Sequence, residues 1–447
     1  MPDLKLGSSV GFKVFVIGCL VIFLLIPTFF IQSVVNERKN RREEVLKDIT
    51  SKWGESQALI GPMLVIPVEF SPKDSKGNVQ TVVRFIYLLP DSLHINGELL
   101  PEIRYRSIYR ILLYTADLDF SGTFDLSNLR DIEVKDGNIE YENAFLEFGL
   151  SDLKGVNNPI SVSWNDGSFV ANPGIITTGA LEKGVHVKSP LAAKKRLNRF
   201  AMNINVNGSE EITFLPVGKE TNVAIHSNWP HPSFTGEFLP QVHNVEKDAF
   251  QAHWKALNFN RNFPQISYND PIKFDKTFFG VKLYYPIDQY QKTTRTVKYA
   301  IMFIGLTFLA YFLIEILNKK QLHPIQYLLV GSGLVLFYIL LLSLSEHIHF
   351  QLAYLCSAVA MVLLTALYTR AILRDRRFMI LISAVLTGLY GFLYVNLQLQ
   401  DYALLLGSIG LFVTLALVMY LTRKIDWFTV LKAGEESVGG NKAAEMG

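Results

Sequence analysis

Residues 14–31 read VFVIGCLVIFLLIPTFFI, eighteen consecutive residues without a charged side chain. A helix needs about 20 mainly apolar residues to cross a bilayer core, so this run is long enough to span a membrane. Lys5 and Lys13 precede it and are compatible with a cleaved signal peptide. However, the run exceeds the usual apolar length of about 7 to 15 residues for such a peptide, and no A-x-A cleavage site follows it. The sequence therefore predicts a retained membrane anchor within residues 1–35.

Five further apolar runs occupy the C-terminal part of the chain, at 299–317, 325–344, 352–369, 378–395 and 402–422. Each run is long enough to cross a bilayer core, and a short polar loop separates each run from the next. The sequence therefore predicts a bundle of five transmembrane helices within residues 296–424.

The loops between these runs alternate between basic and non-basic composition. The basic positions after the first, third and last runs are Lys319, Lys320, Arg370, Arg374, Arg376, Arg377, Arg423 and Lys424. The second loop contains Glu346 and His347, and the only charged residue of the fourth loop is Asp401. Since basic loops face the cytoplasm, the alternation predicts cytoplasmic termini and a periplasmic segment between the first two spans. Basic residues from Arg38 to Arg42 oppose this orientation, but the rule gives little weight to positions that precede a long translocated domain.

Composition separates the middle of the chain from its two ends. The formal charge of the 447 residues is +3, and no basic stripe with interleaved aromatic residues lies outside the membrane flanks. Nucleic-acid binding is therefore not expected. Both cysteines, Cys19 and Cys356, lie in apolar runs, so the middle of the chain has no disulfide.

We predict a cytoplasmic N-terminus with the first span at 1–35, a periplasmic β-rich domain at 36–295, the five-helix bundle at 296–424 and a disordered cytoplasmic tail at 425–447.

The predicted periplasmic domain begins with a helix and continues with strands. Residues 34–57 are typical of a helix that extends from the first span, with an apolar stripe formed by Val35, Leu46, Ile49 and Trp53. Further along, Met202, Ile204 and Val206 alternate with asparagines, and Leu64, Ile66 and Val68 also follow a period of two. Four dipeptides are typical of hairpin turns, namely Asn96-Gly97, Asp136-Gly137, Asp166-Gly167 and Asn207-Gly208. The sequence therefore predicts an antiparallel, sandwich-like domain in an α+β membrane protein.

The sequence contains no recognisable catalytic motif: Walker, G-x-S-x-G, H-E-x-x-H and C-x-x-C patterns are all missing. The four histidines at 226, 231, 243 and 253 lie within 28 residues, but their spacing matches no metal-ligand pattern. We therefore expect no catalytic residue, metal or cofactor, although a periplasmic metalloenzyme that uses the segment from His226 to His253 remains an alternative. Ser345, Glu346 and His347 cannot form a catalytic triad, because consecutive residues of a helix point in different directions.

Glu315 lies inside an apolar run, and a carboxylate at membrane depth is by default a functional candidate. A simpler explanation is an ion pair with Lys319, four residues further on, with the side chain extending toward the membrane surface. The other possible membrane-embedded functional residues are His323, Glu346 and His347. A transporter or lipid-handling protein that uses Glu315 and Asn396 is an alternative, disfavoured because the other runs have almost no ionisable residues at their centres.

The segment 229–240, WPHPSFTGEFLP, combines stiff prolines with aromatic residues. Such an exposed loop is suited to binding a partner, and its candidate contact residues are Trp229, His231, Phe234 and Phe238. A loop that packs over one end of the sandwich is an equally good interpretation.

Several stretches of the sequence resemble the CreD family of bacterial inner-membrane proteins. They are residues 53–62, 229–240, FQAHW at 250–254, 279–290, HPIQYLLVG at 323–331 and LLSLSEH at 341–347, and the likeness extends over about residues 10–424. The resemblance implies a Gram-negative inner-membrane protein linked to envelope integrity and to responses to β-lactams and colicins, with a genetic tie to a two-component regulator. It brings no established catalytic residues.

From the residues and the resemblance together, we expect a non-enzymatic inner-membrane protein that supports the cell envelope through its periplasmic domain. Its expected partners are the lipid bilayer, other envelope proteins and, through the genetic link, a two-component regulatory system.

Overall fold

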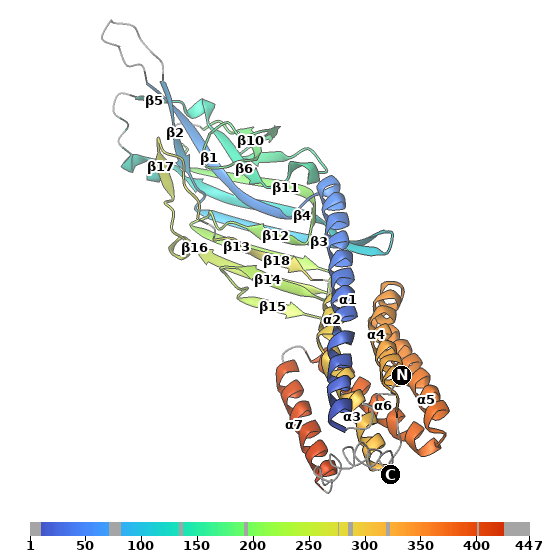
Figure 1. Ribbon diagram of the computed structural model, residues 1–447. Helices are drawn as coiled ribbons and strands as arrows, with labels where there is room; N and C mark the ends of the chain where they lie inside the picture. Colours follow the sequence, from blue (N-terminus) through green and yellow to red (C-terminus); the bar gives the residue numbers. More distant parts are fainter. Residues whose placement is uncertain are drawn as a thin grey trace, which may run out of the picture. The chain divides into compact units, whose positions relative to one another are not determined.

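The computed structural model describes residues 10–70, 82–132, 134, 137–191, 195–275, 277–284, 289–318, 322–399 and 402–423 (Figure 1). The chain divides into two compact units. We call Met1–Arg41 with Ile287–Gly447 the helical unit, and Arg42–Pro286 the sheet unit. The expected tail at 425–447 and the lysines at 319 and 320 lie outside the described residues.

The first helix, α1, runs without interruption from Val10 to Trp53, as the apolar run and the stripe after it predict. The remaining helices are α2 (Gln289–Lys298), α3 (Ala300–Leu317), α4 (Pro324–His347), α5 (Phe350–Leu373), α6 (Arg376–Gln398) and α7 (Ala403–Thr422). Among the described residues, α1, α4, α5 and α6 are long and apolar enough to span a membrane. The pair α2 and α3, bent by 44°, is a fifth candidate, and α7 has a shorter apolar stretch, Leu405–Tyr420. The count of six spans therefore stays a prediction.

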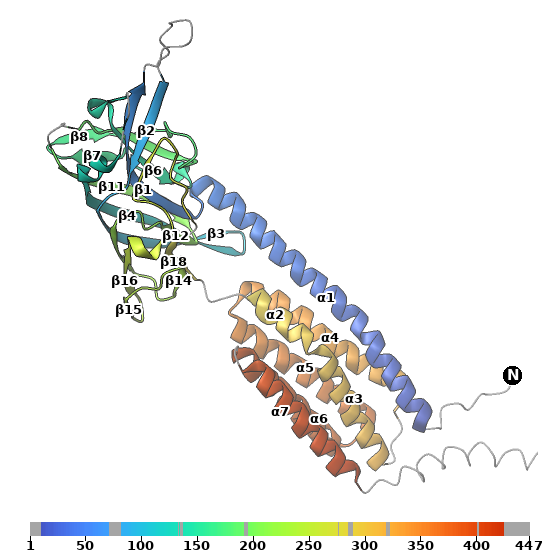
Figure 2. The same ribbon diagram turned by 90° about the vertical axis from the view of Figure 1, so that its left-hand side faces the viewer.

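The first helix packs among the C-terminal helices and does not stand apart as a separate anchor. Leu24, Ile31 and Val35 of α1 are buried. Gly331 of α4 permits a close approach, because a Cβ atom there would lie 2.1 Å from Leu24 Cδ1 and 2.8 Å from Phe308 Cζ. Small residues at such crossings let membrane helices pack closely. The helical unit is thus built from both ends of the chain, and Figure 2 shows α4, α5 and α6 side by side within it.

The sheet unit contains two β-sheets. The ten-stranded sheet consists of β1 (Gln57–Phe70), β2 (Val82–Leu88), β5 (Gly137–Ile139), β6 (Phe145–Leu150), β9 (Asn172–Pro173), β10 (Gly184–Lys188), β12 (Glu211–Phe214), β14 (Pro232–Gly236), β17 (Ile266–Tyr268) and β18 (Phe279–Leu283). The eight-stranded sheet has the order β15-β16-β13-β3-β4-β11-β7-β8. Its strands are β3 (Ser92–Arg106), β4 (Tyr109–Asp125), β7 (Ser161–Trp164), β8 (Gly167–Val170), β11 (Leu197–Ser209), β13 (Glu220–Ser227), β15 (Val242–Val245) and β16 (Phe250–Leu257). Short 3-10 helices lie at Leu126–Asp131, Tyr141–Asn143, Leu153–Gly155 and Asn258–Asn260.

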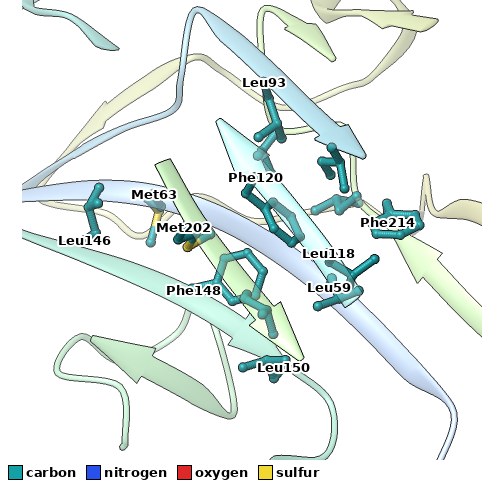
Figure 3. Packing of buried hydrophobic residues seen from close by; sticks show 14 of the residues in the cluster. Leu59, Met63, Leu93, Leu118, Phe120, Leu146, Phe148, Leu150, Met202 and Phe214 are labelled. Carbon is teal, nitrogen blue, oxygen red and sulfur yellow. The ribbon is translucent and has the colours of Figure 1, made fainter. Parts of the chain in front are cut away.

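The two sheets share one hydrophobic core, which confirms the β-rich, sandwich-like prediction for the middle of the chain. Figure 3 shows side chains from both sheets in contact, among them Phe120 of β4 and Phe148 of β6, whose ring centroids lie 5.0 Å apart. Strand β11 buries alternate residues, including Met202, Ile204 and Val206, as its pattern predicts. Two pairings, β1 with β12 and β3 with β13, are parallel, so the domain is not purely antiparallel.

Two of the predicted hairpin dipeptides do not form turns. Asn96-Gly97 lies within β3, and Asn207-Gly208 lies near the end of β11. The glycines serve packing there: a Cβ at Gly97 would meet Leu118 and Ile225, and one at Gly208 would meet the Tyr114 ring. Asp166-Gly167 does lie at the turn between β7 and β8, where Asn165, at a φ of 56°, and Asp166 connect the strands and Gly167 begins β8. Asp136 lies outside the described residues.

Candidate functional site

Glu315 is the most deeply buried of the predicted membrane-embedded candidates, with 5% of the residue exposed. Its carboxylate forms an ion pair with Lys13 of α1. It also accepts hydrogen bonds from the Leu322 backbone N–H at 3.2 Å and from the Tyr327 hydroxyl at 3.0 Å. A buried charge is costly unless it is paired and hydrogen-bonded, and here three separate segments supply the partners. The expected partner Lys319 lies outside the described residues.

A pocket of about 490 Å³ opens beside this carboxylate. Lys13, Glu315, His323 and Tyr327 form its polar lining, and its apolar lining comes from Phe12, Val16, Ile17, Leu322 and Pro324. His323 caps α4, because its Nδ1 accepts a hydrogen bond of 3.3 Å from the Ile325 N–H. The structure thus brings two predicted candidates, Glu315 and His323, into one pocket.

Lys13 and Tyr327 belong to this site although no sequence motif marks them as site residues. A signal for Lys13 was present, because it is the cation that borders the first apolar run. The first and second apolar runs cross the membrane in opposite directions in the predicted topology, so the start of one and the end of the other lie at the same side. Lys13 and Glu315 occupy those two positions.

Glu346 lies near the other end of α4 and belongs to a different cluster. Its carboxylate accepts a hydrogen bond of 3.2 Å from the Tyr290 hydroxyl at the start of α2. Its Oε1 atom also lies 3.9 Å from Nε of Arg38 in α1. His347, the last residue of α4, is exposed. Each end of the helical unit therefore has a carboxylate that contacts a basic residue of α1.

The contacts define which chain segments meet at each end of the helical unit. At the Glu315 end, the Tyr311 and Thr369 hydroxyls lie 2.5 Å apart, so α5 ends beside the end of α3. The basic turn with Arg370, Arg374, Arg376 and Arg377 follows directly, and Asp375 caps α6 by accepting a hydrogen bond from the Arg377 N–H.

The Glu346 end of the helical unit contains Arg38 and Tyr290. The chain passes to the sheet unit just after Arg38 and returns just before Tyr290, so both crossings are at this end.

The segment 229–240 is not one exposed loop, because its central residues form a strand and its aromatic side chains pack partly buried against the core. Residues 232–236 form β14, which pairs with β18. The Phe234 ring packs against Trp254 at a centroid distance of 5.7 Å, and the Phe238 ring packs against Phe279, also at 5.7 Å. Trp229 Nε1 donates to the Tyr284 carbonyl oxygen at 3.1 Å, whereas His231 is exposed. The prolines and glycine suggested a loop, but Pro232 is the first residue of an edge strand, where its missing N–H is tolerated.

Comparison with known proteins decides the family. The family model described as "Inner membrane protein CreD" matches residues 9–428. A curated relative from Escherichia coli K12, also named inner membrane protein CreD, is 35% identical over 428 residues, which cover 93% of this chain and 94% of the relative. The chain belongs to the CreD family. It is therefore an inner-membrane protein with several apolar helices, as the resemblance in its sequence indicated.

The four histidines at 226, 231, 243 and 253 do not converge on one point, although His226 and His253 lie on neighbouring strands and line the same cleft. His226 and His253 lie on β13 and β16, His243 packs against the Phe234 ring at 5.3 Å, and His231 lies beside Trp229. Among the described residues, no group of three or more His, Cys, Asp or Glu side chains is arranged to hold a metal ion. The geometry gives no support to the metalloenzyme alternative.

Other buried ionisable groups of the sheet unit have structural partners. Glu147 accepts hydrogen bonds from the backbone N–H groups of Ile176 and Thr177, both at 2.8 Å. Arg261 donates to the carbonyl oxygens of Phe263 and Val217 at 2.6 and 3.1 Å. Burial lowers the pKa of Arg261 to about 10, so the guanidinium remains charged at neutral pH. These groups hold loops in place.

Proposed function

We propose that this CreD-family protein is a non-enzymatic, multi-pass component of the bacterial inner membrane that supports envelope integrity through a periplasmic sheet unit. Both termini are cytoplasmic in this proposal. The role includes protection against β-lactams and colicins, as the family resemblance implies. The partners are the bilayer and other envelope proteins, with a regulatory link to a two-component system.

One observation carries the orientation in this proposal. Both chain crossings to the sheet unit lie at the Glu346 end, opposite the basic turn from Arg370 to Arg377. Since basic loops stay in the cytoplasm, the sheet unit belongs on the periplasmic side. The basic residues from Arg38 to Arg42 follow the first span on the proposed periplasmic side and count against this orientation. Arg38 counts less, because its guanidinium lies beside the Glu346 carboxylate.

The ion pair between Lys13 and Glu315 supports a structural use of the intramembrane carboxylate. Both carboxylate oxygens already have donors, namely Lys13 and Leu322 on Oε1 and Tyr327 on Oε2. Through these partners, the Glu315 carboxylate joins α1 to α3 and α4. Its role is then to hold the first helix within the helical unit. Since α1 precedes the sheet unit and α2 follows it, the sheet unit is then tethered at both of its ends.

A transporter or lipid-handling protein is the second candidate, and the pocket beside Glu315 favours it. Charged and apolar side chains meet there in a volume of about 490 Å³, which suits an amphipathic molecule. In that case the ionisation of Glu315 is required for the activity itself, and not only for the stability of the helical unit.

Complementation separates the two candidates. A strain that lacks the gene receives the wild-type chain or the Glu315→Gln variant, and β-lactam and colicin susceptibility is measured beside the abundance of the protein in the membrane. Our proposal expects both chains to restore protection in proportion to their abundance. Loss of protection by Glu315→Gln at normal abundance would contradict it and favour transport or lipid handling. Failure of the wild-type chain to protect would refute the envelope role.

A further inference from the structure

A cleft of about 490 Å³ with both polar and apolar side chains crosses the eight-stranded sheet of the sheet unit. Its lining comes from five strands that lie side by side in the order β15-β16-β13-β3-β4, all of which are labelled in Figure 1. The side chains that matter for the argument are Asn96, Glu98, His226, Asn244, Gln251 and His253. None of them belongs to the sites described above in the helical unit.

The strand register places these side chains in two adjacent rows. In one row, Glu98 pairs with His226, His226 with Gln251, and Gln251 with Asn244. In the neighbouring row, Asn96 pairs with Ala224 and Ala224 with His253. Residues two apart on a strand point to the same face, so both rows project from one surface. The small side chain of Ala224 lies between Asn96 and His253 and leaves room at the centre of the cleft.

Asp117, Asp119 and Asn244 of the cleft have hydrogen-bond partners, but five other polar side chains of its lining differ in their bonding from polar groups elsewhere on the same sheet. Along β11, Asn207 is hydrogen-bonded to Thr115 and to Asn157, which also bonds Asn205. Within the described part of the chain, no hydrogen bond or ion pair is made by the side chains of Asn96, Glu98, His226, Gln251 and His253. Their donors and acceptors are therefore available to a ligand, whereas Asn205 and Asn207 of β11 are already bonded to Asn157.

The chemistry of the lining selects among ligand classes. The cleft has amide, carboxylate and imidazole groups but no lysine or arginine, so it lacks the charges that bind phosphate, sulfate or nucleic acid. Amides and carboxylates in rows match the neighbouring hydroxyl groups of a sugar, which need donors and acceptors side by side. Val242 and Ala224 add apolar surface.

We propose that this cleft binds a saccharide that is neutral or carries amino groups. The inference rests on the periplasmic placement proposed above, which exposes the cleft to the saccharides of the envelope.

Retention on immobilised saccharides tests the proposal with the purified full-length protein in nanodiscs. The probes are oligomers of N-acetylglucosamine and of glucosamine, a sulfated polysaccharide and a lysine-rich peptide. We expect retention by at least one of the first two probes. A triple variant, Asn96→Ala, His226→Ala and Gln251→Ala, should lower that affinity at least tenfold. These side chains are outside the hydrophobic core, so its unfolding curve should match that of the wild type.

His94→Ala is the matched control, because His94 is an exposed residue of β3 on the same face but outside the cleft. It should bind like the wild type. The proposal is overturned if neither saccharide is retained, if only the sulfated probe or the peptide binds, or if the His94→Ala control loses as much affinity as the triple variant. Since the assay uses isolated protein, its failure would leave the membrane orientation untouched.

Discussion

Two buried carboxylates, Glu147 in the sheet unit and Glu315 in the helical unit, obtain their partners in different ways. Glu147 is fully buried and accepts three hydrogen bonds from one short loop, two from the N–H groups of Ile176 and Thr177 and one from the Thr177 hydroxyl at 2.6 Å. Among the described residues it has no ion-pair partner. Glu315 instead pairs with Lys13, which lies 302 positions away in the chain.

The difference shows how each unit uses a buried charge. In the sheet unit the Glu147 carboxylate accepts hydrogen bonds from loop N–H groups that have no strand partner. Its effect is therefore confined to that loop. In the helical unit the carboxylate needs an opposite charge, because lipid and packed helices offer little solvation, and the cation comes from the first helix. Glu147 therefore fixes a loop, whereas Glu315 joins distant parts of the chain.

The largest expected effect comes from Glu147→Ala. This change leaves two buried N–H groups and a hydroxyl without an acceptor and creates a cavity, so the free energy of unfolding of the sheet unit should fall by about 3–5 kcal/mol. Glu147→Gln keeps an oxygen for the N–H groups and should cost about 1–2 kcal/mol. Denaturant unfolding followed by tryptophan fluorescence measures both. Equal losses in the two variants would mean that the charge, and not the hydrogen bonds, matters at this position.

Lys13 and Glu315 should show strong energetic coupling. Lys13→Met or Glu315→Gln alone should lower the stability of the helical unit by about 2–3 kcal/mol, because each leaves the other group without its partner. The double variant should lose less than the sum, with a coupling energy of about 1–3 kcal/mol. Thermal unfolding of the four proteins in one detergent gives the cycle. Additive losses would show that the ion pair does not join the helices.

Phe234→Ala tests whether the segment around Trp229 is part of the core. The ring packs on Trp254 and Phe250, so its loss should cost about 2 kcal/mol and reduce abundance in the membrane. Leu239→Ala is the control, because Leu239 is 73% exposed and its loss should change stability by less than about 0.5 kcal/mol. If Phe234→Ala keeps normal stability but loses envelope protection, the ring instead contacts a partner, as the sequence alone suggested.

The smallest expected effect is a pH dependence at Asp125. Hydrogen bonds from Arg196 hold the pKa of this carboxyl well below its ordinary value. A carboxyl with a lower pKa in the folded state stabilises the fold above its unfolded pKa, near about 4, and that contribution disappears as the pH falls further. Arg196 is largely exposed and Asp125 is partly exposed, so solvent screens the pair and the contribution should be below about 1 kcal/mol. Asp125→Asn should remove this part of the acid dependence; an unchanged profile would assign it to other groups.

The sequence was most informative where one physical property decides the structure. Length and lack of charge located α4, α5 and α6, and alternation located β11, because these signals depend only on neighbouring residues. Glu315 was identified for a similar reason: a carboxylate in an apolar run is costly wherever its partner lies.

Features that depend on distant residues could not be predicted in the same way. The parallel pairing of Gln57 with Ile212 joins strands far apart in the sequence, and no local pattern specifies it. Gly97 and Gly208 were interpreted as turn residues, although the rings and side chains that require them belong to other strands. The cleft with His226 and His253 likewise arises from the order of five strands, and sequence spacing gave no sign of it.

The central claim is that the sheet unit lies on the periplasmic side while the basic turn faces the cytoplasm. Single cysteines at Lys247 and at Arg377, introduced into a chain whose Cys19 and Cys356 are replaced by alanine, test it most directly, because both positions are exposed. Spheroplasts are treated with a membrane-impermeant thiol reagent before or after lysis. The account predicts labelling of Lys247→Cys before lysis and of Arg377→Cys only after lysis. The reverse pattern, or labelling of both positions before lysis, would contradict it.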